Sequence, residues 1–251
     1  MTMAPRECPI RVVAVILPVF NEKKVIESTV KAVEAFALIN PHYYFLFVDD
    51  GSNDGSTEII SAAIDTKRHW NIGYLRYAQN RGKGFAIKAG FKMVKADALC
   101  FIDSDLAYSL DHLKVIEELL QTSDVVIGSR KVSSSGKNRS HFIRGVMRTC
   151  FNKLANFILR IRFRDKQAGL KGLRFEVAQQ IFGRSNINGF GFDVELIYLA
   201  KKFGFSITEI DADESELHSY RDGKLTLLKN SIIMFLNLFF IRWQDFLGKY
   251  D

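Results

Sequence analysis

Residues 43–57 read YYFLFVDDGSNDGST, and this stretch decides the fold class. Its first six residues are apolar or aromatic, which predicts a strand buried on both faces, as in a parallel sheet. The strand ends at Asp49 and Asp50, and the Gly, Ser, Asn and Asp residues that follow predict a turn into a helix at 56–64. Two adjacent carboxylates repel each other and resist desolvation, so we expect a ligand or a metal ion to offset their charge.

The same strand–turn–helix pattern continues along the chain. We predict strands at 11–20, 43–48, 74–77, 98–102, 124–128 and 205–212, and helices at 22–38, 56–64, 82–94, 110–121 and 191–204. This alternation predicts an α/β fold, a Rossmann-like, mostly parallel, doubly wound sheet with helices on both faces. Such sheets bind ligands at the carboxyl ends of their strands. Four of these ends carry polar residues, at 18–22, 49–52, 103–105 and 128–130.

The charge of the chain is distributed unevenly. The 251 residues carry a net charge of +7, but residues 130–174 hold thirteen Lys or Arg and one acid, Asp165, a net of +12. The remaining 22 bases and 27 acids give −5. This basic block predicts an anionic partner: nucleic acid, a phosphorylated ligand or an anionic membrane surface. The three cysteines lack metal-ligand spacing, so we expect free thiols in a reducing compartment.

Two segments of the second half are predicted to be amphipathic. Residues 144–164 mix apolar side chains with six bases and predict one basic helix or a pair. Residues 225–247 predict a C-terminal helix, whose apolar run 231–241 would be roughly 16 Å long, too short to span a bilayer core of about 30 Å. We expect this helix to lie in a membrane interface, with a core or dimer helix as the alternative.

The strongest chemical motif is Asp103-Ser104-Asp105. Two carboxylates at the end of one strand suit Mg²⁺ or Mn²⁺, which take one or two carboxylates and complete their shell with water and phosphate oxygens. An isolated pair of this kind more often caps a turn, but the second acidic pair at 49–50 ends another strand of the same predicted sheet. Residues 80–90, NRGKGFAIKAG, place glycines and Lys83 before a helix, which is typical both of a phosphate cradle and of a plain turn.

Five motifs in order carry a family resemblance: VILPVFNE at 15–22, VDDGSNDGS at 48–56, NRGKGFAIKAG at 80–90, FIDSDLA at 101–107 and VIGSR at 126–130. Together they resemble the inverting family-2 glycosyltransferases, which have the GT-A fold. DKQAGLKGL at 165–173, GFGFDVELIYLA at 189–200 and DGKL at 222–225 are similar to dolichyl- or polyprenyl-phosphate sugar synthases. The glucose synthases are nearest, because Ala107 stands where the mannose synthases carry Gln.

The resemblance implies a GT-A domain at 1–223, with a nucleotide-sugar half at 10–130 and an acceptor half at 131–223, followed by the interfacial helix at 224–251. It implies transfer of a hexose, glucose first, from a UDP-sugar to a polyprenyl or dolichyl phosphate, with inversion and with Mg²⁺ or Mn²⁺. It also implies a peripheral position on the cytoplasmic face of an anionic membrane and no nucleic-acid partner. Whether the chain forms a homodimer is left open by the sequence.

Residue roles follow from the matching positions. The nucleoside contacts would be Pro18, Phe20 (in place of the usual Tyr), Glu22, and Asp49 or Asp50. The nucleotide and its diphosphate would be held by Lys83, Asp103, Ser104, Arg130 and Lys224, with Asp103 and Asp105 binding the metal. Gln167, Gly169 and Lys171 would shape the acceptor side, and the catalytic residues would be Asp105, Arg130 and Asp193.

Three alternatives remain open at this point. A phosphate monoester is largely a dianion near neutral pH and needs no general base, whereas a sugar hydroxyl acceptor would need one, and Asp193 or Glu195 would then serve. A second alternative is a GDP-mannose-dependent polyprenyl-phosphate mannose synthase. The third is a non-enzymatic module whose basic block binds nucleic acid or membrane.

Overall fold

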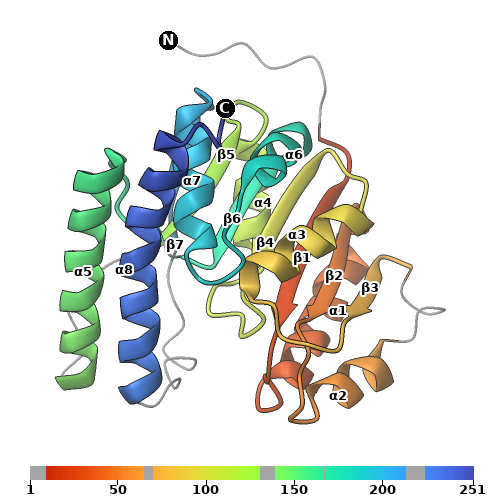
Figure 1. Cartoon of the computed structure of the whole chain (residues 1–251). Helices are drawn as coiled ribbons and strands as arrows, with labels where there is room; N and C mark the ends of the chain where they lie inside the picture. Colours follow the sequence, from red (N-terminus) through yellow and green to blue (C-terminus); the bar gives the residue numbers. More distant parts are fainter. Residues whose placement is uncertain (1–9, 65–69, 131–138, 167, 213–223) are drawn as a thin grey trace.

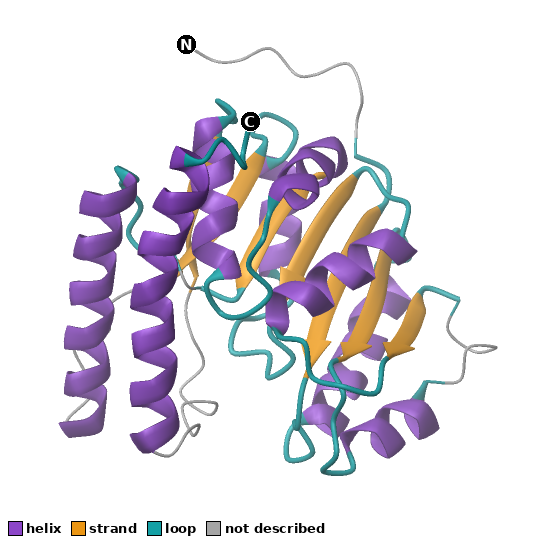
Figure 2. Ribbon diagram, viewed as in Figure 1, coloured by secondary structure: helices purple, strands orange, loops and turns teal. Residues whose placement is uncertain are grey.

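The computed structural model describes residues 10–64, 70–130, 139–166, 168–212 and 224–251, without the side chains of 130, 139–148 and 224–232. These residues form a seven-stranded sheet with helices on both faces (Figures 1 and 2). The strands are β1 Val13–Val19, β2 Tyr43–Asp49, β3 Ile72–Arg76, β4 Ala98–Ile102, β5 Val125–Arg130, β6 Leu170–Arg174 and β7 Ile207–Ala212. The helices are α1 Ile26–Ile39, α2 Ser56–Ala63, α3 Lys83–Met93, α4 His112–Leu119, α5 Arg139–Leu159, α6 Phe175–Arg184, α7 Phe192–Lys202 and α8 Lys224–Phe246.

The sheet confirms the predicted mostly parallel α/β architecture. Its strand order is β3-β2-β1-β4-β6-β5-β7, and β6 alone among these strands runs antiparallel to its neighbours, β4 and β5. Neither β6 nor α6 was predicted. The sequence of β6, LKGLR, contains two bases and a glycine, and Lys171 is fully buried in it only because a carboxylate partner neutralises the ammonium.

Alternating residues of β1 supply the two layers of the core. Val13 and Val15 pack with α1 and α4, whereas Ala14 and Ile16 pack in the cluster that includes α3, α6 and α7. α5 and α8 lie side by side beyond the β7 edge (Figure 1), with the rings of Phe151 and Phe235 5.6 Å apart. The predicted C-terminal helix is therefore confirmed, and its buried residues join the central core.

Several helix boundaries differ from the prediction, two of them by four residues or more at the ends described next. The helix predicted from residue 22 begins at Ile26, after a turn at 23–25 that follows Asn21, whose φ is 57°. The basic helix predicted to reach residue 164 ends at Leu159, where Arg160 takes a left-handed conformation with φ of 54°. Within the described part of the chain, no helix has both the length and the hydrophobicity needed to cross a bilayer.

Candidate active site

The turns after β1 and β2 meet at the carboxyl edge of the sheet, the end to which the parallel strands point (Figure 2). The turn after β1 contributes backbone donors and the loop after β2 contributes side-chain acceptors. These hydrogen bonds join Asn21 N to Ser52 Oγ (3.0 Å), Glu22 N to Ser56 Oγ (2.8 Å) and Lys23 N to Asp54 Oδ2 (3.0 Å). The network fixes the predicted nucleoside-binding segment and leaves Phe20 43% exposed beside it.

Asp49 is fully buried and its carboxylate holds the turn that follows β2. It accepts hydrogen bonds from Ser52 N (2.8 Å), Thr57 Oγ1 (2.5 Å) and Tyr74 OH (3.0 Å). Burial would raise the pKa of Asp49, but the hydrogen bonds from Thr57, Ser52 and Tyr74 outweigh it and lower the pKa. Neither Thr57 nor Tyr74 was predicted. Thr57 follows the turn directly, whereas Tyr74 comes from β3 with no sequence signal.

Asp50 joins the end of β2 to the start of α3. Its two oxygens accept hydrogen bonds from the backbone N–H groups of Arg81 (2.7 Å) and Gly82 (2.8 Å). Protein donors therefore offset the charges of Asp49 and Asp50, which corrects the expectation that a ligand or metal must do so. A nucleoside contact by either residue stays a prediction.

Four charged side chains meet behind this edge. Lys83 Nζ lies 2.8 Å from Asp103 Oδ1 and 3.3 Å from Asp193 Oδ2. Asp193 Oδ1 lies 2.7 Å from Lys171 Nζ, which also donates a hydrogen bond of 2.5 Å to the carbonyl of Ala168. The structure thus brings together four predicted site residues from α3, β6, α7 and the end of β4.

Burial decreases along this group from the interior toward the surface. The Lys171 side chain is 0% exposed, Asp193 5%, Lys83 12% and Asp103 37%. Burial would lower the pKa of Lys83, but the charges of Asp103 and Asp193 outweigh it and raise the pKa, so Lys83 is an ammonium. Burial lowers the pKa of Lys171, and the charge of Asp193 offsets only part of that effect.

The residues after β4 fit a divalent metal bound together with phosphate. Within the described residues, no group of three or more His, Cys, Asp or Glu is placed to hold a metal ion. Mg²⁺ and Mn²⁺ do not need such a cage, because one or two carboxylates, water and substrate phosphate complete their shell. Gly169 makes room for the carboxylate, because a Cβ there would lie 1.8 Å from Asp103 Oδ2. Asp105 Oδ1 accepts a hydrogen bond from Ala107 N (3.1 Å), and the buried Ser104 offers its carbonyl to Thr29 Oγ1 (2.6 Å).

Three predicted site residues cannot be placed by their side chains. Arg130 ends β5 and Lys224 begins α8, but both side chains lie outside the described residues, as does the whole of Gln167. Of the other bases in the basic block, Lys166, Lys171 and Arg174 are buried. The block therefore presents fewer charges to an anionic partner than its sequence suggests.

Glu195 is built into the fold. Its oxygens accept hydrogen bonds from the backbone N–H groups of Asn186 (2.9 Å) and Ile187 (2.9 Å) and from Tyr250 OH (2.6 Å). It is fully buried and both of its oxygens are occupied, which argues against its suggested role as a general base. Its carboxylate instead joins the loop before α7 to the C-terminal segment.

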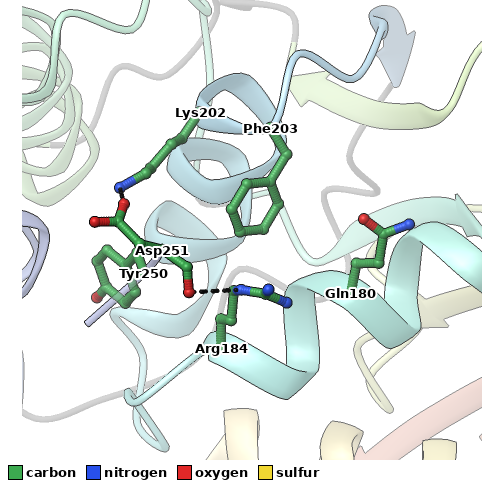
Figure 3. A pocket seen from close by; sticks show the side chains of 6 residues that line it. All are labelled: Gln180, Arg184, Lys202, Phe203, Tyr250 and Asp251. Atoms are coloured by element: carbon green, nitrogen blue, oxygen red, sulfur yellow. Dashed lines mark hydrogen bonds and ion pairs between the residues drawn. The ribbon is translucent and has the colours of Figure 1, made fainter. Parts of the chain in front are cut away.

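A cavity of about 390 Å³ lies at the other end of α7, lined by Gln180, Arg184, Lys202, Phe203, Tyr250 and Asp251 (Figure 3). Lys202 Nζ lies 2.6 Å from Asp251 Oδ1, and Arg184 Nε donates to the Asp251 carbonyl at 3.3 Å. Lys202 is nine residues beyond Asp193, about 14 Å along the helix. The C-terminal residues Tyr250 and Asp251 form part of the wall of this cavity, which is separate from the charged group at the sheet edge.

Comparisons with known proteins bear on the family and the fold of this chain. Residues 14–182 match the family described as Glycosyl transferase family 2. The dolichyl-phosphate beta-glucosyltransferase of Dictyostelium discoideum is 28% identical, covering 94% of this chain and 75% of that protein, and the enzyme of the same name from Homo sapiens is 26% identical, covering 97% and 79%. A crystal structure of glucosyl-3-phosphoglycerate synthase from Mycobacterium tuberculosis with Mg²⁺ and UDP aligns with a TM-score of 0.67 at 17% identity, covering 92% of this chain and 79% of that chain, which shows the shared fold. The family predicted from the five motifs is thereby confirmed: the chain belongs to glycosyl transferase family 2.

Proposed function

We propose that this protein transfers a hexose, glucose in the first instance, from a UDP-sugar to a polyprenyl or dolichyl phosphate with inversion at the anomeric carbon. The observation that carries the proposal is the charged group at the sheet edge, where Lys83 lies 2.8 Å from the partly exposed Asp103. It brings an ammonium and a carboxylate together at the carboxyl ends of the strands, the edge at which sheets of this kind bind their ligands. The names of the two relatives above supply the donor sugar and the acceptor class.

Asp103 and Asp105 would hold Mg²⁺ or Mn²⁺. When bound, the ion supplies positive charge to the leaving diphosphate. The M. tuberculosis enzyme of the same fold was crystallised with Mg²⁺ and UDP, and with Mn²⁺ and UDP-glucose, which supports the choice of ion and nucleotide.

The acceptor chemistry needs charge compensation more than a base. The second pKa of a phosphate monoester is about 6, so the acceptor is already largely a dianion and gives up no proton when it attacks. Its oxygen bonds to the anomeric carbon while the bond to the diphosphate breaks and the electron pair leaves with UDP, which turns an α-linked donor into a β-linked product. At ~4 Å and an effective dielectric near 20, each pair of like charges costs about 4 kcal/mol. Lys83, Arg130 and Lys224 are proposed to offset this repulsion.

The same residues give less support to the alternative functions. A sugar hydroxyl acceptor requires a base, but Glu195 is buried with three donors and both oxygens of Asp193 contact ammonium groups. The motifs at the strand ends argue against a non-enzymatic module. The activity assay described below distinguishes a mannose donor from a glucose donor.

We also propose that α8 seats the protein on an anionic membrane, on the cytoplasmic face. Along the described part of this helix, large apolar side chains are exposed: Ile233, Leu236, Phe239, Phe240, Trp243 and Phe246, the last at 85%. On the adjacent α5, Phe157 is 83% exposed, and bases at Lys153, Arg160, Arg162 and Arg242 on these two helices and the residues after α5 are exposed as well. Exposed apolar side chains together with exposed bases suit an interface with anionic headgroups.

Vesicle co-sedimentation tests the membrane seat. The wild-type protein should bind phosphatidylglycerol vesicles. The double variant Trp243→Ser/Phe246→Ser should bind them at least tenfold more weakly, because about 0.8 kcal/mol is lost for each CH₂ group that is no longer buried. Equal binding by both proteins would contradict the proposal. A concentration-dependent dimer in ultracentrifugation that this double variant abolishes would assign the same face to a second copy instead.

The activity is tested by incubating the full-length protein with membranes and a panel of radiolabelled nucleotide sugars, with and without EDTA, and extracting the lipid. We expect label in the organic phase from UDP-glucose and its loss with EDTA. Label transferred from GDP-mannose alone would show that GDP-mannose, and not UDP-glucose, is the donor. Absence of label from every donor would refute the proposal of a lipid acceptor. Asp105→Ala should abolish transfer with its fold retained, as judged by cooperative thermal unfolding.

A further inference from the structure

Lys83 has two carboxylate partners with different surroundings. Its ammonium lies 2.8 Å from Asp103, whose side chain is 37% exposed, and 3.3 Å from Asp193, whose side chain is 5% exposed. Asp103 is the more exposed of the two partners and is proposed above to bind the metal. Asp193 lies behind it, so a metal ion on Asp103 would displace Lys83 from one partner while the other stays in reach.

Asp193 is itself held in place from the interior. Its second oxygen lies 2.7 Å from Lys171 Nζ, and Lys171 is also tied to the Ala168 carbonyl at 2.5 Å. Lys171 is fully buried and lies 5.6 Å from the centre of the Phe101 ring. Asp193 therefore has little freedom to follow Lys83 or to turn toward a ligand.

The backbone that carries Lys83 is equally constrained. Gly82 has a φ of +97°, and a Cβ there would lie 2.5 Å from the Asn188 carbonyl oxygen. A Cβ on Gly84 would lie 2.6 Å from Phe192 Cβ, and Phe85 N donates a hydrogen bond to Asn188 O at 3.1 Å. The start of α3 is thus packed directly on the loop before α7, and movement of Lys83 is confined to its side chain.

We propose that Lys83 is a resident cation with two positions: it neutralises Asp103 until the divalent metal binds there, and then stays on Asp193 facing the diphosphate. Asp193, fixed by Lys171, is in this view a positioning residue for Lys83 rather than a general base. The inference rests on the proposed function, because it takes Asp103 as a metal ligand.

The test measures the affinity of the full-length protein for Mn²⁺ alone, by calorimetry, in variants that move it in opposite directions. Lys83→Met removes the competing cation from Asp103, so Mn²⁺ should bind roughly tenfold more tightly. Lys171→Met/Asp193→Asn removes the second position and leaves Lys83 on Asp103, so Mn²⁺ should bind roughly tenfold more weakly. Changing both members of the buried pair avoids an unpaired buried charge, and the melting temperature verifies the fold.

The triple variant Lys83→Met/Lys171→Met/Asp193→Asn should recover the tight Mn²⁺ binding of Lys83→Met, which a purely structural role of the pair would not produce. Lys88→Met is the matched control. Lys88 is also on α3 and partly buried, but it donates to the carbonyls of Ser185 (3.4 Å) and Ile187 (3.2 Å), so Mn²⁺ affinity should not change.

The inference would be overturned if the Mn²⁺ affinities of Lys83→Met and Lys171→Met/Asp193→Asn shifted in the same direction or did not shift. Failure of Lys83→Met to bind Mn²⁺ would also overturn it. UDP binding to the wild-type protein in the presence of Mn²⁺ separates the two proposals. If UDP binds and the Mn²⁺ affinities do not diverge, only the two-position lysine is refuted, whereas absence of UDP binding refutes the proposed function.

Discussion

Substituting Gly169 by Ala moves the Asp103 carboxylate and little else. The backbone of Gly169 is not in a left-handed conformation, so its φ and ψ angles are compatible with alanine. Its Cβ would lie 1.8 Å from Asp103 Oδ2 and 2.2 Å from Cγ, whereas ordinary contact begins at 3.4 Å. The carboxylate must therefore retreat by about 1.6 Å, the difference between these two distances.

A displacement of this size should be costly for catalysis. Misplacing a reacting or metal-binding group by 1 Å can lower a rate by about 10²-fold, or about 2.7 kcal/mol of transition-state stabilisation. We therefore expect Gly169→Ala to lower kcat/KM for hexose transfer by about 100-fold and to weaken UDP binding in the presence of Mn²⁺. Overpacking should lower the free energy of unfolding by about 1–3 kcal/mol.

Two other glycines provide matched controls. At Gly172, also on β6, a Cβ would lie 2.2 Å from Ile116 Cγ2 in the core, so Gly172→Ala should reduce stability at least as much without moving Asp103. At Gly183 on α6 a Cβ would meet nothing within 4 Å, and Gly183→Ala should raise stability by about 0.5–1 kcal/mol. Thermal unfolding, UDP calorimetry and initial rates should be measured on all three. A Gly169→Ala protein that is folded and as active as Gly172→Ala would refute the importance of the Asp103 position.

Two further predictions concern buried carboxylates. Glu195→Gln should lower the free energy of unfolding by about 1–3 kcal/mol in urea titrations, because one of its three donors loses its acceptor, and should leave kcat within about twofold; a loss of transfer in the folded variant would restore Glu195 as a base. Asp49→Asn should destabilise by about 1.5–3 kcal/mol near neutral pH. Since the pKa of Asp49 is lowered in the folded state, its contribution is present above the unfolded value of 3.8 and disappears as the pH falls through the folded value. The gap between wild type and Asp49→Asn should therefore close in acid, and a gap independent of pH would contradict the assigned hydrogen bonds.

Much of the sheet could be predicted because its central strands are uninterrupted apolar runs. β2 and β4 are buried on both faces, and their sequences YYFLFVD and ALCFI leave little choice of structure. β6 could not be predicted, because the burial of Lys171 depends on Asp193, 22 residues later in the chain. A local pattern does not contain a partner that only the fold brings close.

The candidate site, like the sheet, could be predicted only in part. The carboxylates at the ends of β2 and β4 were evident from their positions, but what each one contacts was not. Asp49 and Asp50 looked alike in the sequence, yet side-chain hydroxyls and an amide hold one, while the amides of Arg81 and Gly82 hold the other. The pairing of Lys83 with Asp193 spans 110 residues and depends on the packing of α3 against α7.

The most direct measurement compares a short-chain polyprenyl phosphate with the corresponding free polyprenol as acceptors, using the purified protein, UDP-glucose and Mn²⁺. We predict release of UDP with the phosphate alone, and a product whose anomeric proton coupling in nuclear magnetic resonance shows a β linkage. Equal UDP release with the alcohol, or an α-linked product, would contradict direct attack by a lipid phosphate at this site.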